Sequence, residues 1–364
     1  MTSPIFTGVW GKKHIQGIAV DKNRGYIYYS FTTKLVKAKM NGEIVGSVEG
    51  LIGHLGCIAF NEADGYVYGS LEYKHDSIGK NILSAVNSEE SFSDGFYIVR
   101  FDTSKINKTG LSAETDSIMT AVYLKEVVDD YMGTGANTRG EPVPHKYGCS
   151  GIDGLTLAPL PQSNDGKLYL YVAYGIYGDS TRSDNDHQVL VCYDPDIWEE
   201  YAAPLDQKNM HRQGPRHPYK KYFVYTGNTR YGVQNLEYDG FTDTILMAVY
   251  KGSKPEFPNY SLFAVDLTVP PVTNELTGLC EQGEVLSLKK TEQAGETEEA
   301  KKDHPKNSVF GWFFPYGSTG MYSYGDGSWL IARSAVEEGQ QCGYIYPYTW
   351  DGVSPFTCLI PEKE

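Results

Sequence analysis

The 364-residue sequence lacks the short motifs that announce a particular chemistry. It has no GxxxxGK[ST] loop for phosphates, no G-x-S-x-G nucleophile elbow and no H-E-x-x-H zinc motif. Cys149 and Ser150 lie near a predicted strand start, but no base for activating either is visible in the sequence. The sequence therefore gives no support for phosphoryl transfer, serine hydrolysis or zinc proteolysis.

Positive charge is also scarce. The chain has 32 Lys and Arg against 46 Asp and Glu, a formal net charge of -14. Such a balance disfavours nucleic acids and anionic membranes, because binding to either depends on Lys and Arg neutralising phosphates. We therefore expect neither as a partner, and we expect a small polar molecule instead. The sequence leaves the oligomeric state open.

Long apolar runs are missing. No stretch approaches the roughly 20 apolar residues of a membrane span. The first eleven residues show no basic start followed by an apolar run, so no signal peptide is visible. We expect a soluble, cytoplasmic protein, with secretion after removal of a signal peptide as the alternative.

Cysteine is sparse and its spacing is uninformative. The six cysteines form no CxxC pair and no zinc-like spacing. Most of them lie inside apolar strand patterns, where a free Cys behaves as a small hydrophobic residue. We therefore expect free, buried thiols, with disulfides as the alternative.

Aromatic residues and glycine are abundant. Aromatics make up 13% of the chain, including 29 Tyr, and there are 39 Gly, which together favour strands and tight turns over helices. A strand–turn–strand pattern at residues 16–33 recurs at residues 56–73 with its apolar, turn and aromatic positions in register. Recurrence of one hairpin indicates a repeat architecture.

The repeat extends over the whole chain. Twelve residues separate Ile18 from Ser30, and the same spacing recurs in the second, fourth and fifth units. The third unit departs from it, with a turn six residues longer. Each unit holds about four short strands, which is the content of one propeller blade. The pattern resembles that of β-propeller repeats in general.

We predict an all-β fold, a five-bladed β-propeller of four-stranded antiparallel blades. A six-bladed ring is the main alternative. An open solenoid is disfavoured, because the end units carry no polar capping face. The prediction is a single domain over residues 1–364, with blades at about 14–50, 51–125, 148–228, 230–290 and 308–362 and long loops at 74–94, 126–147, 174–187, 196–220 and 291–307.

Three local predictions follow from the same reading. Ile5–Trp10 is expected to pair with the far end of the chain. Val285–Leu288 is expected to be the outer strand of the fourth unit. The charged run Thr291–Asn307 is expected to be a solvated loop or a short helix.

The long inserts are expected to share one face of the ring, and loops on a rigid scaffold often carry function. Residues entering the first strand of each unit would converge at the mouth of the central channel on that face: His14, Gln16, His54, Asp153, Gln234 and Thr319. Residues at the exits of the second strands and in nearby loops would join them: Glu72, Lys74, Tyr174, Tyr177, Arg230, Tyr231, Tyr250 and Arg333.

These residues suggest two classes of function. As an enzyme, the protein would bind a carbohydrate or sugar acid and use Asp153 and Glu72 as an acid–base pair, with His14 and His54 assisting. Five-bladed propellers of similar layout include families that hydrolyse glycosides, which is an analogy of fold. The other class is a non-catalytic propeller that senses a ligand or docks proteins.

The remaining residues of this set would bind the ligand or pack within the blades. Tyrosines would stack on a sugar ring or simply fill the sheets, and the amides would bind hydroxyls or satisfy buried backbone groups. A divalent metal at His14, His54 and Asp153, serving a metal-assisted lyase or hydrolase, is a less favoured alternative. Open metal sites usually need three protein ligands, and Asp153 is the only acid in the ring of strand entries.

Overall fold

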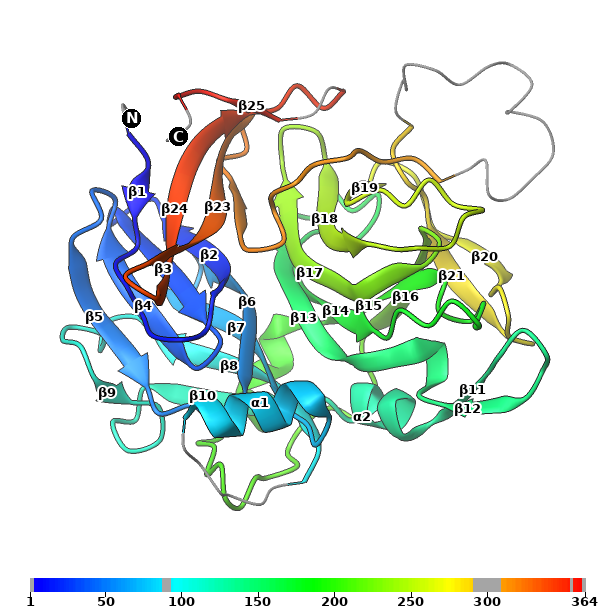
Figure 1. Ribbon diagram of the computed structural model, residues 1–364, viewed down its shortest axis with the longest axis horizontal. Coiled ribbons are helices and arrows are strands. Elements are labelled where there is room, and N and C mark those ends of the chain that lie inside the picture. Colours follow the sequence, from blue (N-terminus) through cyan, green and yellow to red (C-terminus); the bar gives the residue numbers. More distant parts are fainter. Residues whose placement is uncertain (1–2, 87–92, 291–308, 354–355, 362–364) are drawn as a thin grey trace.

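The computed structural model describes residues 3–86, 93–290, 309–353 and 356–361 and shows a five-bladed β-propeller (Figure 1). Five sheets surround a common centre, and the innermost strand of each sheet contacts the innermost strand of the next. The first and last of these strands also contact each other, so the ring is closed. The predicted fold class is confirmed, and the six-bladed alternative is wrong.

The first two blades each contain four strands that follow one another in the sequence. Tight turns join the four strands of blade one, whereas blade two has a tight turn only between its first two strands. Blade one contains β2 (Ile15–Asp21), β3 (Tyr26–Phe31), β4 (Lys34–Lys39) and β5 (Ile44–Glu49), with β9 (Leu111–Ser112) added in parallel at its edge. Blade two contains β6 (His54–Asn61), β7 (Tyr66–Tyr73), β8 (Gly95–Asp102) and β10 (Met119–Tyr123).

Blade three is extended by a segment predicted for blade four. Its own strands are β13 (Cys149–Ala158), β14 (Tyr169–Ile176), β15 (His187–Tyr193) and β16 (Lys220–Tyr225). Beyond β16 the sheet continues with β21 (Gln282–Leu286), which runs parallel to β16, and then with β20 (Val272–Glu275).

Blade four is therefore a sheet of three strands: β17 (Thr229–Asp239), β18 (Thr244–Lys251) and β19 (Leu262–Asp266). The prediction that Val285–Leu288 is its outer strand is wrong as stated. Val285 pairs with Phe223 in blade three, whereas Leu288 forms an isolated bridge with Val265 in blade four. The segment therefore passes from blade three to blade four within a few residues. The pattern of apolar residues in the sequence does not reveal this change of partner.

Blade five is completed by both ends of the chain. It contains β22 (Met321–Ser323), β23 (Ser328–Glu337) and β24 (Gln340–Thr349). At its outer edge, β1 (Ile5–Phe6) and β25 (Thr357–Cys358) both pair antiparallel with β24. The predicted pairing of the amino-terminal segment with the far end of the chain is confirmed. This pairing joins the two ends of the chain in one blade and covers part of the edge of β24.

The long inserts contain structure of their own. The insert after β7 forms α1 (Ser77–Ala85), whose first turn is capped by the Asp76 carboxylate accepting from Gly79 N. The insert before β13 holds α2 (Lys125–Met132), β11 (Thr134–Ala136), β12 (Pro142–Pro144) and η1 (Lys146–Gly148). A third insert carries η2 (Pro195–Ile197) and α3 (Trp198–Tyr201). The predicted loop or helix at Thr291–Asn307 lies outside the described residues.

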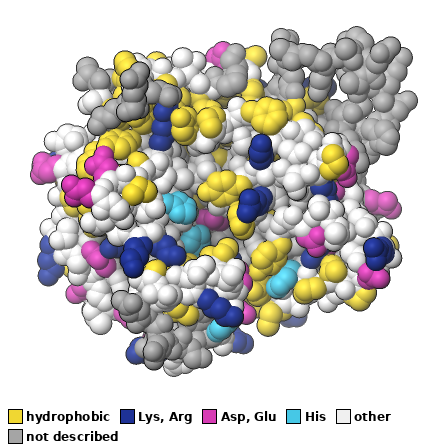
Figure 2. All heavy atoms as spheres, in the orientation of Figure 1, with side chains coloured by type: hydrophobic (Ala, Val, Ile, Leu, Met, Phe, Trp, Pro, Cys, Tyr) yellow, Lys and Arg dark blue, Asp and Glu magenta, His cyan; other side chains and the backbone are white. Residues whose placement is uncertain are grey.

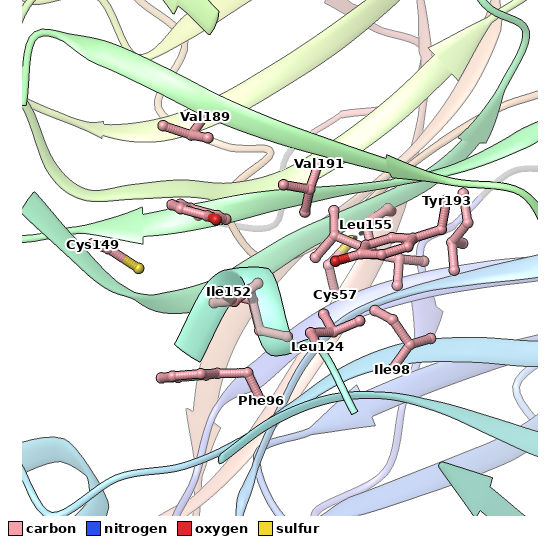
Figure 3. Packing of buried hydrophobic residues seen from close by; sticks show 14 of the residues in the cluster. Cys57, Phe96, Ile98, Leu124, Cys149, Ile152, Leu155, Val189, Val191 and Tyr193 are labelled. Atoms are coloured by element: carbon pink, nitrogen blue, oxygen red, sulfur yellow. Dashed lines mark hydrogen bonds between the residues drawn. The ribbon is translucent and has the colours of Figure 1, made fainter. Parts of the chain in front are cut away.

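The core lies between the blades rather than in one central mass. Figure 3 shows one such layer, where Ile98 of blade two and Leu124 at the start of the next helix face Leu155 and Val191 of blade three. At the centre of the ring, the Cys57 thiol lies 3.3 Å from Leu155 O and 3.2 Å from Asn235 Oδ1. All six cysteines are free. In the part of the chain that the structure describes, no helix is long and apolar enough to cross a membrane.

Candidate functional site

A pocket of about 350 Å³ opens at one end of the ring axis. It is lined where the innermost strands begin and where the second strands end, as the repeat predicted. Figure 2 shows histidine, acidic and basic side chains gathered in the hollow at the middle of this face. We call this pocket the funnel, and its lining is Lys13, His14, Gln16, Thr32, His54, Glu72, Lys74, Ile78, Ile82, Ser150, Ile152, Asp153, Gly175, Tyr231, Gln234 and Tyr250.

Nine of the predicted site residues meet in this funnel. They come from four of the five blades and from positions far apart in the sequence. They are His14, Gln16, His54, Glu72, Lys74, Asp153, Tyr231, Gln234 and Tyr250.

β-Bulges in the innermost strands orient these side chains toward the pocket. The pairing between the first two strands slips by a residue or more in blades one to four, between Ile15 and Gly17, for example, and between Leu55 and Ile58. A β-bulge turns the side chains next to it away from the regular alternation. The bulges fall at the funnel end of each strand, so they let successive residues on one strand reach the pocket.

Glu72 and Lys74 form a buried ion pair in the funnel wall. Lys74 Nζ lies 2.7 Å from Glu72 Oε1, and it also donates a hydrogen bond to Ser150 O. The second carboxylate oxygen of Glu72 accepts from the Ile152 backbone N–H at 3.0 Å. Burial opposes ionisation of Glu72, but the charges of Lys74 and His54 outweigh it and hold its pKa below the ordinary value. Glu72 is therefore an ionised carboxylate.

Asp153 lies in the opposite electrostatic state. Burial, only partly offset by His54 and reinforced by the charge of Glu72, raises its pKa to about 7. Its Oδ1 is buried and has no hydrogen-bond partner among the described residues. One funnel thus holds two carboxyl groups, one that is ionised and one that is about half protonated at pH 7.

Two histidines lie beside these acids. His54 Nδ1 lies 3.4 Å from Glu72 Oε1, directly across the β6–β7 pair. Burial alone would lower the pKa of His54, but Glu72 and Asp153 outweigh it and raise the pKa. Burial, with help from the charges of His54 and Lys13, lowers the pKa of His14 to about 4. His14 is therefore neutral at pH 7.

Two glycines, which have no side chain, make room for the carboxyl groups of Glu72 and Asp153. A Cβ atom on Gly151 would lie 2.0 Å from Glu72 Oε2, and one on Gly56 would lie 2.2 Å from Asp153 Oδ1. Such distances are far below any van der Waals contact. Both glycines belong to the innermost strands, at positions where other blades carry polar side chains into the funnel.

The other polar lining groups are amides and hydroxyls. Gln16 Nε2 donates to Thr32 Oγ1 at 3.0 Å, and Gln234 Nε2 donates to Tyr231 O at 3.1 Å. At the rim, the rings of Tyr231 and Tyr250 meet edge to face at 6.0 Å and remain 40% and 36% exposed. Tyr231 has a φ of 66°, which is uncommon for a bulky residue and often marks a functional site.

Two of the predicted tyrosines lie outside the lining. Tyr174 is fully buried under α2, and its hydroxyl donates to Asp130 Oδ2 at 2.7 Å. The hydroxyl of Tyr177 donates to Asp76 Oδ2 at 3.3 Å. Both tyrosines bind carboxylates of the inserts and so hold the inserts against blade three. The sequence analysis expected these tyrosines at the channel mouth, but the inserts cover them.

Three further predicted residues are also outside the lining. Thr319 Oγ1 donates to Ala332 O at 2.9 Å. The Arg333 guanidinium lies 3.9 Å from the ring centre of Tyr316 and bonds the Tyr348 hydroxyl within blade five. Arg230 is exposed and lines a separate depression next to the funnel. Blade five therefore contributes no side chain to the described lining.

The sequence reading missed the apolar wall of the funnel. Ile78 and Ile82 of α1 form that wall, and Lys13 and Ser150 add polar groups. The four-residue spacing of Ile78 and Ile82 is a helical signal that could have indicated α1 within the insert. Within the described ranges, no three His, Cys, Asp or Glu side chains cluster closely enough to hold a metal ion.

Comparisons with known proteins give a likeness of fold only. No family model matches the chain, and no curated protein matches it by sequence. Among solved structures, a GH43 β-1,3-galactosidase in complex with galactodeoxynojirimycin aligns over 100% of this chain and 99% of its own, with a TM-score of 0.43 and 11% identity. A match at that level does not indicate which ligand this chain binds.

Proposed function

We propose that the funnel binds a carbohydrate or a sugar acid and that Asp153 and Glu72 cleave a glycosidic bond by acid–base chemistry. The observation that carries the proposal is the opposite pKa shift of these two carboxyls within one pocket. Pairs of titratable groups whose environments push their pKa values apart are typical of acid–base sites. The volume of the funnel also lies within the range of small-molecule sites.

In this proposal the two carboxyls have separate roles. Asp153, whose pKa of about 7 leaves it about half protonated at pH 7, donates its proton to the leaving oxygen of the glycosidic bond. Glu72 is ionised and acts on the opposite side of the bond, either on water or on the sugar carbon itself. Lys74 keeps Glu72 charged, and His54 lies close enough to both acids to tune them.

The rest of the lining suits a polyhydroxylated ligand. Gln16, Thr32 and Gln234 offer donors and acceptors for hydroxyl groups. Tyr231 and Tyr250 present ring faces and phenol groups together, a combination that suits the apolar faces and polar edges of sugar rings. Ile78 and Ile82 of α1 form an apolar wall on one side of the funnel.

The test is turnover of a panel of nitrophenyl glycosides and of neutral and acidic oligosaccharides. Asp153→Asn is expected to lower kcat by about 100-fold or more, because a general acid supplies that much of the rate. The matched control is Asp326→Asn in an exposed turn, where the amide oxygen still accepts from Ser328 N. The proposal is overturned if Asp153→Asn and His54→Ala turn over every substrate as the wild type does.

A non-catalytic ligand-sensing role is the second candidate. It is favoured by the engagement of both Glu72 oxygens with Lys74 and Ile152, which suits a fixed binding wall. The same panel separates the two roles. A sensor would bind a sugar and show a thermal shift without any product, and Asp153→Asn would alter affinity alone.

A further inference from the structure

A second depression adjoins the funnel and shares its aromatic rim. It has a volume of about 830 Å³, and we call it the groove. Tyr231 and Tyr250 line both the funnel and the groove, so a ligand that passes these two rings enters one from the other. The lining of the groove is Gly178, Asn228, Arg230, Tyr231, Tyr250, Lys251, Gly252 and Ser253.

The groove is positively charged in a strongly acidic protein. Among the described residues, its lining contains Arg230 and Lys251 and no carboxylate, whereas the whole chain carries a net charge of -14. Both cations are exposed, and neither forms an ion pair with any described residue. In the funnel, by contrast, Lys74 is paired with Glu72.

The two cations are held at the ends of paired strands. Arg230 lies opposite Tyr250 across the β17–β18 pair, and Lys251 lies opposite Thr229. The Arg230 guanidinium lies 5.2 Å from the ring centre of Tyr231. The β17–β18 pair positions the backbone of Arg230, Tyr250 and Lys251, and Tyr231 follows Arg230 in the bulge, so both cations and both rings lie along one depression.

Tyr231 lies between the funnel and the groove and lines both. Its backbone conformation is energetically unfavourable for a tyrosine. A φ of 66° disfavours a bulky side chain, and the next residue, Gly232, also has a positive φ of 72°. Residues such as Asn or Gly adopt this conformation more readily. An exposed tyrosine kept at such a position is consistent with a contact surface for a ligand rather than with packing.

We propose that the groove binds an anionic sugar unit of an oligosaccharide whose neighbouring unit occupies the funnel. The inference rests on the proposed function and names the substrate class: oligosaccharides that carry a carboxylate or a sulfate ester. A guanidinium binds either anion through two parallel hydrogen bonds, and a lysine adds a second positive charge. The tyrosine rings stack on the sugar between the two depressions.

The test is calorimetric binding of three compounds to the intact protein. They are trigalacturonate, its methyl ester, which has the same sugars without charge, and a κ-carrageenan oligosaccharide, which carries sulfate but no carboxylate. We expect trigalacturonate or the sulfated compound to bind at least about tenfold more tightly than the methyl ester. The preference should shrink as salt screens the exposed charges.

Variants then test whether the groove residues cause the preference for the anionic compounds. The double variant R230Q/K251Q is expected to remove it, whereas Lys22→Gln, which removes one charge from an exposed turn, should leave it unchanged. Tyr231→Asn tolerates the same backbone and removes the ring, so it should weaken binding of all three compounds without loss of thermal stability. The relative affinity of the two anions identifies which one the groove prefers.

Two results would overturn the inference: equal binding of charged and uncharged compounds by the wild type, or an anion preference that survives in R230Q/K251Q. These outcomes are separable from failure of the proposed function. If Asp153→Asn abolishes cleavage but R230Q/K251Q keeps the wild-type preference, only the groove is wrong. If the groove binds anionic sugars and no glycosidic bond is cleaved, only the hydrolytic function is wrong.

Discussion

Gly56 faces Asp153 across the contact between blades two and three. A Cβ atom at residue 56 would lie 2.2 Å from Asp153 Oδ1 and 2.6 Å from Ser70 Oγ. Ser70 in turn donates to Asp153 O at 2.6 Å. In the repeat, Gly56 and Asp153 are equivalent positions of neighbouring blades. Blade two therefore has no side chain at residue 56, and the carboxyl group of Asp153 from blade three occupies that space.

We predict that Gly56→Ala disables the site and destabilises the protein. The added methyl group must displace Asp153 or Ser70, and overpacking of this kind costs about 1–3 kcal/mol. The free energy of unfolding from urea denaturation and the turnover of any identified substrate are the measurements. Gly240→Ala is the matched control, because among the described residues its Cβ would have only Tyr238 Cε1 within 4 Å, at 3.9 Å. Equal behaviour of the two variants would contradict the steric argument.

The pH dependence of turnover should follow Asp153. A general acid with a pKa of about 7 is protonated below that value, so kcat/KM should fall about tenfold per pH unit above it. Glu72 has a lowered pKa, so the acidic limb should lie below pH 4.5. A pH–rate profile with a flat alkaline limb in the wild type would exclude Asp153 as the acid.

Stability gives a test of Asp153 that needs no substrate. Its folded-state pKa is raised from 3.8 to about 7, so the protonated form is favoured by folding and stability is lost as pH rises through that window. Asp153→Asn cannot ionise and should be more stable than the wild type above pH 7, by up to about 4 kcal/mol, since each pKa unit is about 1.4 kcal/mol. Below pH 4 the two proteins should have similar stability. Urea denaturation at several pH values measures the difference, and a constant difference would contradict the raised pKa.

Lys74→Met should be strongly destabilising. It leaves the Glu72 carboxylate buried without its cation, and breaking a buried pair in this way costs about 3–5 kcal/mol. The double variant Glu72→Gln with Lys74→Met should recover much of that loss, and a double-mutant cycle by urea denaturation measures the coupling. Lys105→Met, which removes an exposed pair with Asp102, is the control and should cost less than about 1 kcal/mol. An additive cycle would show that the two side chains do not depend on each other.

Much of the fold was readable in the sequence because short-range spacing determines it. The twelve-residue phase from Ile18 to Ser30 located the inner hairpins, since alternation and turn length are local properties. The passage of Val285 into blade three and Leu288 into blade four was not readable. Both residues have the same apolar character, and only the packing between blades decides which partner each one takes.

The candidate site divides in the same way. Residues on the inner strands, such as His54 and Asp153, were placed together because equivalent positions in a ring must converge. Tyr174 was misjudged, because α2 covers it and Asp130 binds its hydroxyl. Arg333 was misjudged because Tyr316 and Tyr348 hold it within its own blade. Side chains beside long inserts depend on tertiary contacts that the repeat pattern does not contain.

The opposite end of the ring holds another carboxyl group whose ionisation opposes folding. Glu237 Oε1 accepts from Ser323 N at 2.8 Å, and burial, reinforced by the charge of Asp239, raises its pKa to about 8. Because the raised pKa favours the protonated form in the folded state, stability is present at low pH and is lost as pH rises from about 4.5 through 8. Glu237→Gln keeps the acceptor oxygen and removes the ionisation.

We therefore expect Glu237→Gln to leave the free energy of unfolding nearly unchanged at pH 5 and to raise it by about 1 kcal/mol or more at pH 9. Glu338→Gln, at the exposed tip between β23 and β24, is the control and should change stability by less than about 0.5 kcal/mol at both pH values. Because Glu237 lies away from the funnel lining, turnover should not change. A stabilisation that is equal at pH 5 and pH 9 would mean that packing, rather than ionisation of Glu237, sets the difference.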